Sequence, residues 1–102
     1  MIRHLVFIRF AATTTEDEKA AIFADLSALK RFVPGLRAFA GGPNVSTEGL
    51  ARGFTHGFSV DFDDVAARDA YLIHPAHQAA GARLVKAAEG GVDGLAVLDF
   101  AA

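Results

Sequence analysis

The chain has 102 residues, which is the size of one compact domain, so we expect residues 1–102 to form a single domain. Ten Lys and Arg against twelve Asp and Glu leave a net charge of −2, and no basic stripe of the kind that nucleic acid requires is present. No apolar run approaches the roughly 18 residues of a membrane-spanning helix. The absence of cysteine excludes thiol chemistry, disulfides and cysteine-based zinc sites. We therefore expect a cytoplasmic protein without nucleic-acid or membrane partners.

Hydropathy patterning and turn residues predict four strands and three helical segments. Thr15 and Glu18 form a capping box at a helix start, and Pro34-Gly35 ends that helix. From Phe54 to Phe62 large apolar residues alternate with small or polar ones, which is typical of a strand. In chain order we expect a strand over 2–10, a helix over 16–33, a strand over 36–40, a loop over 41–53, a strand over 54–62, helices over 65–72 and 76–89, and a strand over 94–100.

This order predicts an α+β fold of the ferredoxin-like βαββαβ type, with a four-stranded antiparallel sheet and the helices on one face. The other face needs a cover. Its expected members are small or apolar, namely Thr55, Gly57, Ser59, Leu5, Phe7, Leu98 and Phe100. A second copy of the same sheet is the natural cover, so we expect a symmetric homodimer through the open sheet face. Hydrophobic residues make up 52% of the chain, and such an interface accounts for part of them.

Two histidines lie among apolar residues of predicted strands. His4 and His56 both face the helices by alternation, and we expect them to approach each other beneath the helical layer. One interpretation is that both are structural core histidines with satisfied hydrogen bonds. The other is that burial lowers the imidazole pKa, which suits acid/base chemistry near neutral pH.

A second group lies where the two C-terminal helices meet. His74 and His77 are three residues apart, but no third ligand stands at a suitable spacing, so we expect no metal site there. Tyr71 and His77 could form a general acid and base at a pocket mouth, or Tyr71 could anchor the helix. The segment from Gly41 to Ser46 lacks the lysine of a phosphate-binding loop, and we expect no cofactor.

Several segments together resemble the stress-responsive α/β-barrel (Dabb) domain family. They are Ile2-Arg3-His4-Leu5-Val6, Gly53-Phe54-Thr55-His56 and above all Tyr71-Leu72-Ile73-His74-Pro75-Ala76-His77. The resemblance implies a dimeric ferredoxin-like barrel. By similarity to a family member that cyclises a polyketide, it also implies catalytic roles for Tyr71 and His77. It further implies substrate contacts for His4, His56, Asp99, Phe23 and Leu26, although Leu26 and Phe54 depart from that enzyme's pattern.

These residues are consistent with three different functions. The first is a protein with an apolar pocket between sheet and helices, lined by His and Tyr, that binds a small hydrophobic or polyketide-like molecule. The second is a cofactor-independent cyclase or lyase in which Tyr71 and His77 act on a carbonyl substrate. The third is a cofactor-free monooxygenase. The enzyme hypothesis requires an open cavity, and it loses its physical basis if Phe23, Phe39 and Phe58 fill the space between sheet and helices.

Overall fold

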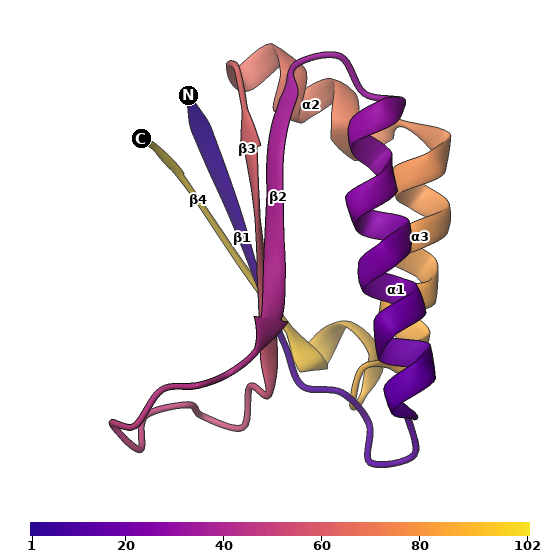
Figure 1. Ribbon diagram of the computed structural model, residues 1–102, viewed down its shortest axis with the longest axis vertical. Helices are drawn as coiled ribbons and strands as arrows, with labels where there is room; N and C mark the ends of the chain where they lie inside the picture. The colour runs from indigo at the N-terminus through magenta and orange to yellow at the C-terminus, as the bar shows by residue number, and fades with distance from the viewer.

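A computed structural model describes all residues from 1 to 102. The elements in chain order are β1 (Ile2–Ile8), α1 (Glu16–Ala28), the 3₁₀ turn η1 (Leu29–Arg31), β2 (Leu36–Pro43), β3 (His56–Phe62), α2 (Val65–Ile73), α3 (Pro75–Ala87), the 3₁₀ turn η2 (Gly91–Gly94) and β4 (Leu95–Ala101). The strands form one antiparallel sheet in the order β2-β3-β1-β4. All three helices lie on one face of it (Figure 1). The predicted ferredoxin-like architecture is confirmed.

Side chains at the helix starts explain where the helices begin. Thr15 accepts a hydrogen bond from the backbone N–H of Glu18 at 3.1 Å, as the capping box predicts. At the start of α2, Asp64 accepts a hydrogen bond from the backbone N–H of Ala67 in the same way. At α3 the cap is His74, whose Nδ1 accepts from the backbone N–H of Ala76 at 3.0 Å, and Pro75 follows as the first helical residue.

The β2–β3 loop is displaced along the chain relative to the prediction: β2 continues through residues 41–43, and the loop runs over 44–55 instead of 41–53. Gly41 makes this possible: a Cβ atom there would lie 2.7 Å from both Phe23 and Phe58, so only glycine lets the strand pass these rings. On the other side, β3 begins at His56 rather than at residue 54. Phe54 has left the alternation, and its ring lies 5.9 Å from that of Phe7 on the face away from the helices.

Other predicted boundaries shift by a few residues. Strand β1 ends at Ile8 rather than residue 10, and α1 ends at Ala28 because the last turn before Pro34 is a 3₁₀ turn. None of the helices combines the length and apolar character that crossing a bilayer requires.

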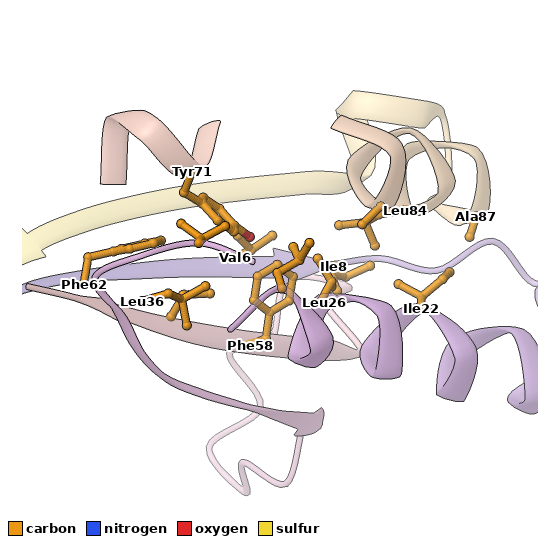
Figure 2. Close-up of a cluster of buried hydrophobic side chains, with 14 of the residues drawn as sticks. Val6, Ile8, Ile22, Leu26, Leu36, Phe58, Phe62, Tyr71, Leu84 and Ala87 are labelled. Carbon is orange, nitrogen blue, oxygen red and sulfur yellow. The ribbon is translucent and has the colours of Figure 1, made fainter. Parts of the chain in front are cut away.

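The hydrophobic core lies between the sheet and the helices (Figure 2). Ile8 and Phe62 are completely buried on the sheet, and Ile22 and Leu26 of α1 pack against them from above. The opposite face is open. Phe7, Leu98 and Phe100 are each more than 40% exposed there, as the alternation predicts.

Candidate functional site

Three aromatic side chains with polar atoms meet on the helix-covered face, below α2. Tyr71 of α2 lies between His4 of β1 and His77 of α3, with ring centroids 6.0 Å and 4.2 Å away. Phe62 packs against the tyrosine ring at 4.9 Å. The structure thus brings together Tyr71, His77 and His4, three of the residues that the sequence singled out.

Tyr71 is 1% exposed, and its side chain runs from α2 toward Val6 in the core (Figure 2). Burial raises the pKa of its phenol to about 12, and neither a hydrogen bond nor a nearby charge contributes to that shift. No side-chain oxygen that is fully cut off from solvent lacks a hydrogen-bond partner. The hydroxyl therefore stays protonated and free to donate, and the small exposed surface of Tyr71 includes its oxygen.

His77 occupies the first turn of α3 and is half-buried. Its Nδ1 lies 3.2 Å from the backbone carbonyl oxygen of Leu72, which can only accept, so Nδ1 is the donor. Burial lowers the pKa of His77, the Leu72 carbonyl opposes this, and His4 and His74 add to the lowering. A neutral ring with its proton on Nδ1 leaves Nε2 with a free lone pair, as a general base requires.

His4 is held by a chain of polar contacts that runs across the sheet. Its Nδ1 lies 2.6 Å from Oδ1 of Asp99 on β4, and Arg68 of α2 donates to Oδ2 of the same carboxylate at 2.7 Å. Burial alone would raise the pKa of Asp99, but the hydrogen bonds from Arg68 and His4 outweigh it, so the pKa lies below its usual value. Asp99 therefore stays ionised and orients the His4 ring, with Nε2 on the opposite side of that ring.

Arg68 was not predicted as part of any site. It stands one helical turn before Tyr71, so both side chains point to the same side of α2. The three-residue spacing of Arg68 and Tyr71 is visible in the sequence, but the sequence cannot show that β4 brings Asp99 next to Arg68.

His56 does not join this group, and the expectation that it approaches His4 is wrong. His4 pairs with Val60 in the sheet, whereas His56 pairs with Ile8 four residues further along β1. At about 3.4 Å per residue the two histidines stand roughly 13 Å apart along the strands. Alternation gave the correct face, but the antiparallel register places them at opposite ends.

The surroundings of His56 are aromatic. Phe10 and Phe23 lie 4.9 Å and 6.1 Å from its ring, and Thr55 Oγ1 contacts its Nδ1 at 2.8 Å. Burial lowers the pKa of His56, Lys19 adds to this and Glu16 opposes it. His56 and Phe23 therefore belong to a second cluster at the other end of the sheet.

The three principal hollows of the molecule do not open onto Tyr71, His77 or His4. Phe23 contacts the rings of Phe39 and Phe58 within the layer between sheet and helices, and Leu26 is part of the closed core. One hollow, of about 590 Å³, lies instead on the open side of the sheet below the β2–β3 connection. None of the three principal hollows is therefore the pocket between sheet and helices that the sequence led us to expect, and Tyr71 itself is only 1% exposed.

No group of three His, Asp or Glu side chains is arranged to hold a metal ion. His74 and His77, the pair considered for this role, are used differently. The first caps α3 through Nδ1, and the second donates to a backbone carbonyl.

The chain is similar to proteins of known sequence and structure over its whole length. The model of the family described as stress-responsive A/B barrel domain (Dabb) matches residues 2–102. Olivetolic acid cyclase from Cannabis sativa is 30% identical over 76 residues, which cover 74% of this chain and 75% of that protein.

Two solved structures share the fold closely. A dimeric ferredoxin-like protein of unknown function from Jannaschia sp. CCS1 is 37% identical, with a TM-score of 0.92 over 99% of this chain and 98% of that one. A hydroxynitrile lyase from Passiflora edulis is 25% identical, with a TM-score of 0.86 over 97% of this chain and 90% of that one.

Proposed function

Since the chain belongs to the stress-responsive α/β-barrel (Dabb) family, we propose that it is a homodimer that binds a small apolar molecule carrying a carbonyl oxygen, held by Tyr71. The observation that carries this proposal is the phenol of Tyr71, which is 1% exposed and whose hydroxyl has no partner that affects its pKa. The hydroxyl makes no hydrogen bond within the chain, and its oxygen lies at the edge of the buried ring. A ligand oxygen placed there would accept a hydrogen bond worth about 1 kcal/mol in net terms.

The environment of Tyr71 sets the chemistry of the ligand. Val6 and Phe62 are buried beside it, which favours an apolar body. Because burial keeps the phenol protonated and neutral, its O–H can donate to a carbonyl oxygen. His4, fixed by Asp99, supplies a second polar contact from the sheet side. These features support a ketone or aldehyde rather than a charged molecule.

The dimer is proposed from the open sheet face. Phe7, Leu98 and Phe100 are exposed there, and a contiguous apolar surface of this kind commonly marks an interface. The relative from Jannaschia, which matches nearly the whole chain, is described as dimeric. This supports a second copy as the cover of the open face.

Acetophenone and ethylbenzene test the binding proposal, because they differ chiefly in the carbonyl oxygen. Titration of the isotope-labelled protein, followed by amide NMR signals around Tyr71, measures both affinities. We expect wild type to prefer acetophenone about tenfold and Tyr71→Phe to lose this preference, since one hydrogen bond is worth about 1 kcal/mol or more. His74→Asn, which can still cap α3, is the control and should keep the preference. Equal binding of both compounds to wild type would contradict the proposal.

Proton transfer from carbon is the second candidate function. The free Nε2 of His77 favours it, whereas the packed rings of Phe23, Phe39 and Phe58 count against it, because they leave no open cavity for a substrate between sheet and helices. In this reaction Nε2 removes a proton from the carbon next to the carbonyl, and the C–H electron pair forms the enolate double bond. The carbonyl π electrons move to oxygen, where the Tyr71 hydroxyl stabilises the negative charge by hydrogen bonding. Two relatives are enzymes by name, a cyclase and a lyase, which supports a catalytic function for this chain.

Deuterium exchange separates the two functions with the same compound. In D₂O, a general base at His77 should exchange the methyl protons of acetophenone for deuterium, which ¹H NMR detects as signal loss. We expect His77→Gln and Tyr71→Phe to slow exchange at least tenfold, and His74→Asn to leave it unchanged. Binding without protein-dependent exchange would leave the ligand-binding function and reject the catalytic one.

A further inference from the structure

The connection between β2 and β3, residues 44–55, forms an arm that extends away from the sheet on the side opposite the helices (Figure 1). Neither the hydrophobic core nor the Tyr71 cluster uses it. Connections of about this length without a helix or strand are uncommon in compact domains, and many of them carry a function.

The root of the arm is fixed to the sheet. The Arg9 guanidinium lies 4.4 Å from the centre of the Phe54 ring, and Arg9 Nε donates to the backbone carbonyl of Arg52 at 3.1 Å. The first and last residues of the arm are joined by a hydrogen bond, in which the backbone N–H of Asn44 donates to the carbonyl oxygen of Thr55 at 2.8 Å. The root of the arm is therefore fixed within the single chain, which lowers the conformational entropy that the arm loses when it binds.

The arm presents apolar side chains to solvent. Val45 is 86% exposed and Leu50 is 58% exposed. Below the arm is the hollow of about 590 Å³, whose apolar lining includes Leu50, Phe54 and the exposed Phe7 of β1. Arm and open face thus share exposed apolar side chains around this hollow, beside the polar Asn44, Ser46 and Arg52, and the chain by itself leaves them uncovered.

We propose that the arm of each copy lies against the open face of a second copy, so that the partner covers Val45 and Leu50 and fills the hollow. This inference rests on the proposed dimer and adds a reciprocal pair of contacts to it. In a two-fold interface the same surface serves both copies, so two arms are engaged at once. The dimeric relative that matches 99% of this chain favours a second copy as the occupant.

Part of the charge on this side is already paired within the chain. Arg3, the charged residue of β1 on the open face, forms an ion pair with Asp61 at 2.8 Å, so two open faces meet without an unpaired charge on that strand. Arg9 and Arg52 at the root of the arm make no ion pair, and Arg9 is held over the Phe54 ring instead.

Sedimentation equilibrium of Leu50→Asp against Phe32→Asp is the first test. Both side chains are 58% exposed in the single chain, but Phe32 lies next to η1 on the helical side. We expect Leu50→Asp to raise the dimer dissociation constant at least tenfold and Phe32→Asp to leave it unchanged. An increase below tenfold for Leu50→Asp, in a wild type that is dimeric, would overturn the arm contact and leave the dimer standing.

A spin label tests the same contact without disturbing it. Because the chain has no cysteine, Thr47→Cys gives a single attachment site in the arm, and Ser27→Cys gives one on α1. Each labelled, unenriched protein is mixed with ¹⁵N-enriched wild type. We expect the Thr47 label to broaden open-face amide signals of the enriched copy, and the Ser27 label to spare them. Absence of broadening from Thr47 would overturn the inference, whereas a monomeric wild type would reject the dimer itself.

Discussion

The two faces of the sheet are built from alternate residues of the same strands, yet their side chains are buried to different degrees. On the helix-covered face Ile8 and Phe62 are fully buried, and even a polar residue such as His4 is closed in with its carboxylate partner. On the open face Phe7 and Phe100 are more than 40% exposed. The first face completes its contacts within one chain, and the second leaves its apolar side chains uncovered. With the proposed dimer, stability and assembly depend on separate sets of positions.

Replacing one phenylalanine on each face should separate these two roles most strongly. Phe62→Ala removes a fully buried ring and should lower the free energy of unfolding by about 3–5 kcal/mol. Phe100→Ala, on the open face, should cost less than about 1 kcal/mol in the monomer. Urea unfolding at a concentration below the dimer dissociation constant measures both. Similar losses for the two variants would contradict the division.

For assembly, the open face should be the sensitive one: a change there should weaken the dimer, and a change outside it should not. Leu98→Asp would bury an unpaired carboxylate between two copies, and we expect the dimer to weaken about 100-fold or more while the chain stays folded. Val92→Asp places the same charge at a residue of similar exposure in η2, outside the open face, and should leave assembly unchanged. Size-exclusion chromatography with light scattering distinguishes these outcomes. A dimeric Leu98→Asp protein would exclude the open face as the interface.

A smaller effect is expected for the polar contacts of Asp99 on the helix-covered face. Arg68→Gln removes the stronger of the two hydrogen bonds that lower the pKa of Asp99, so this pKa should rise, which carboxyl ¹³C NMR measures directly. Because the folded-state pKa of Asp99 is depressed, its stabilisation is present above the unfolded value of about 3.9 and is lost as pH falls through the folded value. At pH 7 we expect a loss of about 1 kcal/mol.

Arg83→Gln is the matched control for this change. Its partner is Asp25, and both side chains of that pair are about half exposed, so less than about 0.5 kcal/mol should be lost. An unchanged Asp99 pKa in Arg68→Gln would show that Arg68 does not act on the carboxylate.

The smallest expected effect concerns His77. Burial depresses its pKa in the folded chain, so between that value and about 6.5 the unfolded chain binds more protons, and stability rises with pH. Melting temperatures measured from pH 5 to 8 should therefore increase across this range. His77→Gln should remove part of the increase, by no more than about 4 °C. The same pH dependence in both proteins would assign it to another group.

Much of the architecture could be predicted because it depends on local chemistry. The Thr15 cap, the end of the first helix region near Pro34 and the alternation from His56 to Phe62 are properties of short segments. The order of these segments then favours one antiparallel topology. Tyr71 and His77 could also be paired, because one helix end and the next helix start hold them close together.

The sequence by itself determined the fold class, the family and the face of the sheet on which each strand residue lies. Only the tertiary structure decided how far along the strands these residues stand, because alternation has a period of two and carries no register. Register separates His56 from His4, and it brings Asp99 of β4 opposite His4. Packing of α2 over β4 then adds Arg68 to that carboxylate, and Gly41 lets β2 pass the Phe23 ring. These are contacts between segments distant in sequence, and their geometry exists only once the sheet has formed.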